Sequence, residues 1–240
     1  MEQGTDRNIL ELQREIAYLR KEFEEFVYAV SHDLRTPLRA ISNLSEWIAE
    51  DIEDNNADVQ ENLALLQNRA GRMERMVEGL LELSRVGREK LEVTTFDAPA
   101  AIDQIVQTYE PFAGSIAIDC RVAEVTTYKA KFIQTMHALI DNAVKYNDKG
   151  ERAIITITMD AHEAAYAINV VDNGQGISHH EQGDVFKVFY TTHAKDEHDT
   201  TGVGLTLVQK IITYIGGSIA LESAVGEGTS VAVEWPIANS

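Results

Sequence analysis

The stretch from Val30 to Ile41 (VSHDLRTPLRAI) combines residue types that suit group transfer. His32 stands beside a carboxylate, Asp33, with Thr36 one helical turn further on and Pro37 directly after it. A neutral imidazole is a nucleophile, and its reference pKa near ~6.5 leaves much of it neutral in the cell. A lone histidine on a helix is more often an ordinary surface residue, so this stretch alone gives only a candidate acceptor.

A predicted helix containing HALIDNAVKYN places an amide and an ammonium on one face. Its apolar residues repeat at helical spacing, whereas Asn142 and Lys145 share another stripe with Ala138. Such a pair suits a metal ion and the phosphates that it bridges. A solvated polar face is the commoner explanation of one such stripe taken alone.

Two glycine-containing stretches follow the helix. In VVDNGQGI an apolar strand ends at Asp172, and the chain turns through Gly174 and Gly176, where backbone can approach a ligand closely. A carboxylate at that position can accept a hydrogen bond from an exocyclic amine. In TTGVGLTLV, Gly202 and Gly204 precede an apolar helix whose unpaired N–H groups can hold phosphate. Each stretch alone fits a simple turn, but together with the Asn142 helix they predict a nucleotide site.

The elements that must position His32 begin with a heptad pattern. Apolar residues recur at alternating steps of three and four from Ile9 to Val30, which favours a parallel coiled coil over a helix packed on its own domain. His32 lies two positions beyond this seam, so its ring should face outward. Pro37 predicts a kink just after the histidine.

Two helices joined by a polar turn over residues 50–58 are expected next. The second one repeats the three-four apolar pattern from Leu63 to Leu80. A two-helix hairpin cannot bury both of its apolar faces alone. We therefore expect two hairpins to close a four-helix bundle as a homodimer.

The pattern changes from Phe96 onward, where residues alternate with the period of strands. Strands are predicted around residues 155–159, 166–170 and 231–235, and helices over residues 98–109, 129–145 and 203–215. This order predicts an α/β sandwich with helices on one face of a sheet. The whole chain is thus expected to be an α+β multidomain protein.

Composition limits the possible partners and compartments. The 240 residues are 44% hydrophobic and 25% charged, as in an ordinary globular protein, and no run is long enough to span a membrane. Cys120 is the only cysteine, which favours a reducing, cytoplasmic location. The net charge of -18 argues against binding a nucleic-acid backbone.

These stretches together resemble, in order and approximate spacing, the sequence boxes of sensor histidine kinases. His32–Pro37 resembles the phosphoacceptor box, and HALIDNAVKYN resembles the asparagine box. Asp172–Gly176 and Gly202–Leu207 resemble the two glycine boxes. Phe186 with Phe189 resembles the phenylalanine box, and Gly226–Thr229 resembles the final glycine turn. The resemblance covers nearly the whole chain.

The resemblance implies a role for each matching residue. His32 would accept the γ-phosphoryl group of ATP on Nε2, Asp33 would orient the ring and help remove its proton, and Thr36 would position water for a phosphatase reaction. Asn142 would bind Mg²⁺, Lys145 a phosphate and Asp172 the adenine. The residues that would frame the nucleotide, partly under a mobile lid over residues 191–201, are Tyr146, Gly174, Gly176, Lys195, Gly202, Gly204 and Leu205.

The resemblance also implies an organisation and partners. Residues 1–29 would be a coiled-coil signalling helix, residues 30–90 the dimerisation and histidine phosphoacceptor domain, and residues 96–240 the catalytic ATP-binding domain. The expected partners are a second copy of the chain and the receiver domain of a response regulator. An upstream sensor domain is expected to be missing from this chain.

Three positions depart from the family pattern. Ala138 stands one turn before Asn142, where asparagine is usual, and this leaves the coordination of Mg²⁺ open. Thr206 occupies a position that is often glycine. Asp33 replaces the more frequent glutamate, as it does in subgroups related to phytochromes.

Two other interpretations remain open at this point. A non-catalytic phosphotransfer or scaffold protein would explain Ala138 but not Asp172 and both glycine loops. A chaperone-type or repair-type ATPase would leave VSHDLRTP unexplained.

Overall fold

The computed structural model describes Phe23, Val27, Ser31, His32, Leu34 and Arg35, and residues 38–49, 57–192 and 200–238. The chain forms two compact units, a first unit from Met1 to Ser84 and a second unit from Arg85 to Ser240. The predicted coiled coil lies outside the described residues except at Phe23 and Val27, and so do Asp33, Thr36, Pro37 and Lys195. Among the described helices, none has both the length and the apolar composition that crossing a membrane requires.

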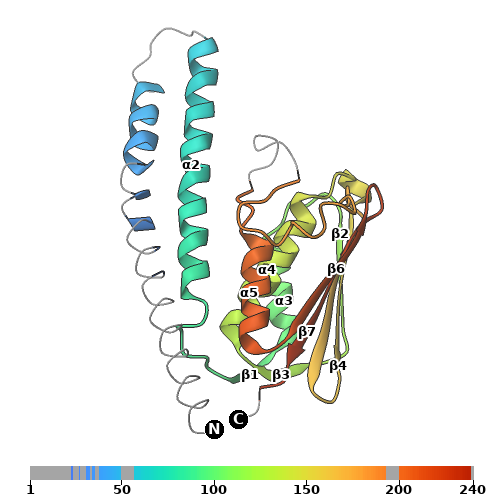
Figure 1. The fold of residues 1–240 in the computed structure, drawn as a ribbon. Coiled ribbons are helices and arrows are strands. Elements are labelled where there is room, and N and C mark those ends of the chain that lie inside the picture. The colour runs from blue at the N-terminus through green and yellow to red at the C-terminus, as the bar shows by residue number, and fades with distance from the viewer. Residues whose placement is uncertain are drawn as a thin grey trace, which may run out of the picture. The chain divides into compact units, whose positions relative to one another are not determined.

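The first unit contains the predicted helical hairpin (Figure 1). Residues 38–49 form one helical segment, and α2 (Ala57–Arg85) forms the other. Leu38 on the first segment and Ala70 and Val77 on α2 are buried. Arg39 Nε lies 2.9 Å from Glu74 Oε1, which ties the two segments together at the surface. The three-four apolar pattern therefore does produce two packed helices.

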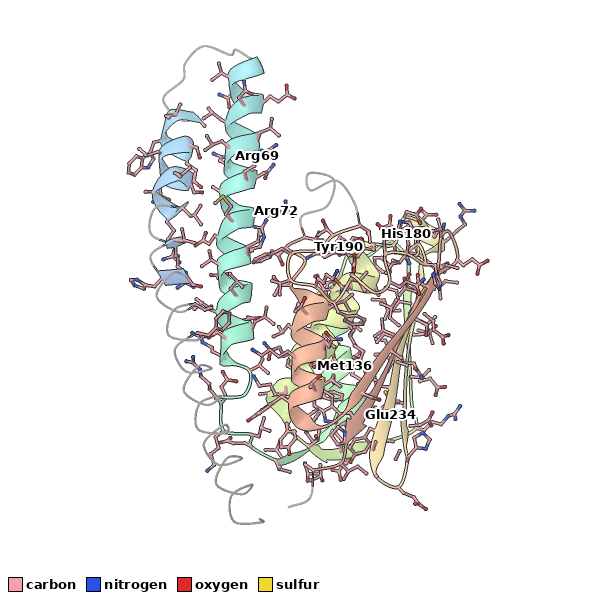
Figure 2. The ribbon with its side chains drawn as sticks, in the orientation of Figure 1. Arg69, Arg72, Met136, His180, Tyr190 and Glu234 are labelled. Carbon is pink, nitrogen blue, oxygen red and sulfur yellow. The ribbon has the colours of Figure 1, made fainter. Side chains whose placement is uncertain are left out.

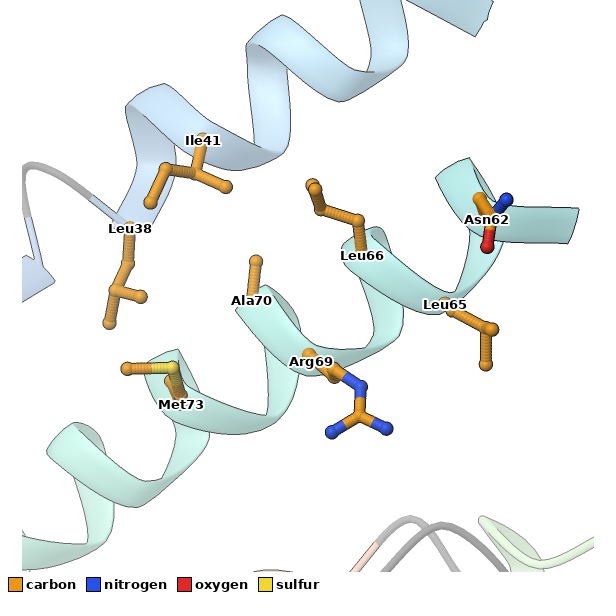
Figure 3. Close-up of a pocket in the computed structure, with 8 residues that line it drawn as sticks. All are labelled: Leu38, Ile41, Asn62, Leu65, Leu66, Arg69, Ala70 and Met73. Carbon is orange, nitrogen blue, oxygen red and sulfur yellow. The ribbon is translucent and has the colours of Figure 1, made fainter. Parts of the chain in front are cut away.

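Part of the hairpin's apolar surface stays exposed. An apolar hollow of about 370 Å³ lies between the segments, where Leu38 and Ile41 face Leu66, Ala70 and Met73 (Figure 3). Large apolar side chains that remain exposed on this unit include Leu34, Ile41, Leu44, Trp47, Ile48, Leu65, Leu66 and Met73. Large exposed apolar surfaces are typical of interaction sites.

The second unit is built on a five-stranded sheet with the order β2-β4-β5-β7-β6. Its strands are β2 (Ser115–Cys120), β4 (Ile154–Ala161), β5 (Ala165–Asp172), β6 (Ser218–Ala224) and β7 (Gly228–Pro236). β2 pairs in parallel with β4, and the other neighbours are antiparallel. A short antiparallel pair, β1 (Thr94–Asp97) with β3 (Glu124–Thr127), lies beside this sheet.

Three helices cover one face of the sheet (Figure 1). They are α3 (Ala98–Gln107), α4 (Lys129–Lys145) and α5 (Gly204–Ile215). Met136 of α4 is fully buried in the layer between the helices and the sheet (Figure 2). Phe132 packs edge-on against Trp235, whose indole N–H donates to Thr127 Oγ1 at 2.6 Å. The core thus fixes the helices by apolar packing and one satisfied polar contact.

The predicted sandwich is confirmed, with all of its proposed strands and helices. Sequence patterns missed β1, β2, β3 and β6. β6 reads SIALESA and alternates exposed with half-buried residues, of which only Ile219 and Leu221 are large and apolar, so its period carries little apolar signal. β1 begins at Thr94, before the expected start of the second domain at residue 96, because pairing with β3 decides its conformation.

Candidate active site

The amide of Asn142 lies beside the beginning of α5. The apolar face of α4 is fully buried at Phe132 and Met136, which leaves Asn142 on the half-buried opposite stripe. A Cβ built on Gly204 would lie 3.7 Å from Asn142 Oδ1. The structure therefore brings the asparagine helix and the second glycine stretch together.

The N-terminus of α5 is open to an anion. Its N-cap, Val203, provides no side-chain hydrogen bond, and the first helical bond runs from Leu207 N to Val203 O. The N–H groups of Gly204 and Leu205 therefore have no partner within the helix, and the helix dipole makes this end positive. Thr206 Oγ1 is buried and lacks a hydrogen-bond partner in the described part of the chain. The free N–H groups of Gly204 and Leu205 fit phosphate oxygens.

Asp172 ends β5 as the sequence predicted. Its Oδ1 accepts a hydrogen bond from Gly174 N at 2.8 Å. Burial raises the pKa of Asp172, while hydrogen bonds from the backbone N–H groups of Gly174 and Thr229 act in the opposite direction. A desolvated carboxylate of this kind is stabilised further by any ligand N–H that it can accept from.

Tyr146 connects the asparagine helix to both glycine stretches. Its carbonyl oxygen accepts from Gln175 N at 3.3 Å, and its hydroxyl pairs with Thr200 Oγ1 at 3.1 Å. Tyr146, the C-terminal cap residue of α4, thus contacts Gln175 in the first glycine stretch and Thr200 in the second. Three stretches that are far apart in the sequence meet at one place.

The glycines of the first stretch serve the protein's own backbone. A Cβ on Gly174 would lie 2.6 Å from Tyr146 O, and one on Gly176 only 1.9 Å from Ala224 O. The sequence argument expected these glycines to make room for a ligand. The close approach that the structure shows is between the loop and its neighbouring chain segments.

Gly202, in the second glycine stretch, also makes room for the protein's own backbone. Its φ is +68°, and a Cβ there would lie 2.5 Å from Tyr190 O. Phe189 N donates to Gly202 O at 2.9 Å. These contacts hold the loop that carries Tyr190 against the residues that lead into α5 (Figure 2).

Replacing Gly176 by alanine should destabilise the second unit strongly. Gly176 has a φ of +68° and the Ala224 clash, whereas Gly226 has a φ of +82° and open space around it. We expect about 1–2 kcal/mol for Gly226→Ala from the left-handed backbone alone, and on the order of 3–4 kcal/mol for Gly176→Ala. Urea unfolding of both variants measures the difference, and equal losses would contradict the packing explanation.

Lys145 is paired within its own helix. Its Nζ lies 2.8 Å from Asp141 Oδ2, while Asp141 Oδ1 accepts a hydrogen bond from Tyr109 at 3.3 Å. Burial raises the pKa of Tyr109, and the Asp141 charge raises it further, so the phenol stays protonated and donates. A phosphate contact by Lys145 would therefore exchange the Asp141 carboxylate for a phosphate oxygen.

A small amide network that the sequence analysis missed holds the first glycine stretch in place. Asn173 Oδ1 accepts from Asn147 Nδ2 at 3.1 Å and from Ile154 N at 2.8 Å, and Asn173 Nδ2 donates to Arg152 O at 2.9 Å. In the sequence, each of these asparagines stands beside a turn. Asparagine is so common at turns that its presence there does not identify a network.

His32 belongs to the first unit, where it is helical and exposed. Its exposure agrees with the outward position expected from the heptad pattern. Among the described residues, no group of three or more His, Cys, Asp or Glu side chains could hold a metal ion.

Two family models match the chain. Residues 24–89 match the His Kinase A (phospho-acceptor) domain, and residues 127–239 match the histidine kinase-, DNA gyrase B- and HSP90-like ATPase. Cyanobacterial phytochrome B of Nostoc sp. is 30% identical over 92% of this chain and 30% of its own length. Sensor protein SrrB of Staphylococcus aureus is 30% identical over 89% of this chain and 38% of its own length. The chain thus spans about a third of the curated relatives that it matches.

Solved structures share the fold. Full-length ShkA in complex with AMPPNP has a TM-score of 0.68 at 21% identity, over 90% of this chain and 46% of that one. ThkA in complex with the response regulator TrrA has a TM-score of 0.61 at 21% identity, over 89% of this chain and 61% of that one.

Proposed function

Because the chain belongs to the sensor histidine kinase family, we propose that it is a kinase core that uses ATP to phosphorylate its own His32. A phosphoacceptor hairpin and a nucleotide-binding unit in one chain support this proposal. His32 is exposed, as an acceptor must be. The observation that carries the proposal is the convergence of Asn142, Asp172 and the start of α5.

The nucleotide-binding residues have distinct proposed tasks. Asp172 accepts from the exocyclic amine of adenine, and the first N–H groups of α5 bind phosphate. Asn142 provides one oxygen ligand to Mg²⁺, which when bound neutralises charge on the phosphates. Lys145, released from Asp141, adds a positive charge, and Lys195 is a further proposed phosphate contact. Phosphoryl transfer needs such alignment and charge neutralisation more than covalent help.

Chemistry at the hairpin completes the reaction. His32 Nε2 forms a bond to the γ-phosphorus as the bond to the β–γ bridging oxygen breaks, and ADP leaves. Asp33 orients the ring and takes the proton of the other ring nitrogen. The phosphoryl group then passes to an aspartate of a response regulator receiver domain. We also propose that Thr36 positions water when the protein dephosphorylates that partner.

The exposed apolar side chains of the hairpin support a homodimeric four-helix bundle. Leu65, Leu66 and Met73 on α2 and Trp47 on the first segment stay exposed in a single copy. A second copy would cover them, since two hairpins bury what one cannot.

Incubation with Mg²⁺ and γ-labelled ATP tests the proposal. We expect phosphate on the protein that is stable in alkali and labile in acid, as a phosphohistidine is. A protein that binds no nucleotide and takes up no phosphate would contradict the proposal. ATP turnover without any phosphohistidine would favour a simple ATPase instead.

Asp172→Asn should weaken nucleotide binding. Asparagine keeps an acceptor oxygen but carries no charge, and a hydrogen bond to a charged acceptor is worth about 1–1.5 kcal/mol more than one to a neutral acceptor, which is about a 5- to 13-fold rise in the Kd for ATP. Purine riboside triphosphate, which lacks the 6-amino group, provides the control, because its affinity should change far less. Calorimetry with both nucleotides decides, and an equal loss for both would show that Asp172 does not contact the amine.

A further inference from the structure

A buried lysine holds the segment that leaves the hairpin. Lys131 of α4 is only 6% exposed. Its Nζ lies 2.5 Å from Glu89 Oε2 and 3.3 Å from Gln134 Oε1. A lysine is rarely buried to this degree without a charged partner, because removing its ammonium from water is costly. Glu89, between the end of α2 and the start of β1, provides that partner.

The same segment touches a second helix. Gly87 has a φ of +100°, and a Cβ there would lie 3.6 Å from the ring of Tyr214 on α5. The preceding residue, Val86, is 4% exposed. The chain that follows α2 is therefore joined to α4 by the Glu89–Lys131 ion pair and passes close to α5.

These attachments lie at the far ends of both helices from the nucleotide site. Lys131 precedes Asn142 on α4 by about 16 Å of helix at 1.5 Å per residue. Tyr214 lies near the end of α5, whereas Gly204 begins it. A change at Glu89 is therefore not expected to alter the nucleotide contacts directly.

We propose that the Glu89–Lys131 ion pair is a latch that sets the length of the tether between the phosphoacceptor hairpin and the nucleotide-binding unit. This inference rests on the proposed kinase function. Glu89 and Lys131 are positioning residues, because they act on the delivery of ATP to His32 without touching either. A short tether keeps the effective concentration of the bound nucleotide at His32 high.

The expected size of the effect follows from the tether's length. Opening the latch lengthens the tether from about four residues (Arg85–Arg88) to about nine (Arg85–Val93), since β1 begins at Thr94. Effective concentration falls roughly as the −3/2 power of length, so the rate of His32 phosphorylation should fall about threefold.

Charge reversal at Glu89 tests the latch. Glu89→Lys places two ammonium groups together, whereas Glu92→Lys makes the same charge change at an exposed residue three positions along the segment. For Glu89→Lys we expect a threefold slower initial rate, faster hydrogen exchange of the amides of residues 86–93, and a Kd for ATP within twofold of the original. Lys131→Met, which keeps the apolar stem, should behave like Glu89→Lys. The double variant Glu89→Lys with Lys131→Glu should restore both the rate and the protection.

The outcomes separate the latch from the kinase proposal. If the original protein phosphorylates His32 and Glu89→Lys matches Glu92→Lys in rate or in exchange, the latch is wrong and the kinase stands. A rise in the Kd for ATP that accounts for the slower rate would also overturn the latch. If the original protein takes up no phosphate, the kinase proposal fails and the latch falls with it.

Discussion

His32→Gln should take up no acid-labile phosphate from Mg²⁺ and ATP. Glutamine preserves a polar, helix-compatible side chain but has no nucleophilic ring nitrogen. His32 is exposed on the first unit, so the replacement should not disturb packing. The Kd for ATP should stay unchanged, because the residues proposed to bind the nucleotide all belong to the second unit.

A matched control for this loss is His137→Gln. His137 is also exposed and helical, but it lies on α4 of the second unit, with its ring against Tyr109. This variant should keep its phosphorylation. Undiminished uptake by His32→Gln would move the acceptor to another side chain and remove the assigned role of the hairpin.

Asn142→Ala should slow phosphorylation on the order of 100-fold or more, comparable with the loss of one transition-state donor in other enzymes. Ala138 adds no second oxygen ligand one turn away, so Asn142 carries the only amide among Ala138, Asn142 and Lys145. The affinity for ATP should fall in the presence of Mg²⁺. With EDTA the two proteins should bind ATP about equally, because the metal-dependent contact is then absent from both.

Asn169→Ala is the comparison for this variant. Asn169 is half-buried on β5 on the face away from the helices, and its loss should leave the rate within twofold. If Asn142→Ala lost the same affinity with and without Mg²⁺, Asn142 would act by shaping the site and not by binding the metal.

The sequence predicted most of the second unit because its core elements have strong periods. Ile155, Ile157 and Met159 alternate on β4, and Phe132 and Met136 mark the buried face of α4. Weak strands such as β2 and β6 could not be predicted, since pairing with central neighbours, more than their own composition, holds them in the sheet.

The site was predicted residue by residue, but the physical reasons were only partly right. Asp172 at the end of β5 and the open start of α5 agree with the sequence argument. For Gly176 the fold reveals a reason that the sequence could not show, since Ala224 lies against it. Likewise, no sequence spacing connects Lys131 to Glu89, whose ion pair depends on how the segment after α2 packs.

Mapping the phosphorylated residue tests the central claim most directly. The protein is incubated with Mg²⁺ and ATP, digested under neutral or alkaline conditions, and its peptides are sequenced by mass spectrometry with gentle fragmentation. We expect one phosphoramidate, on His32, among the seven histidines of the chain. Phosphate on a different residue, or none on a protein that binds ATP, would contradict the account.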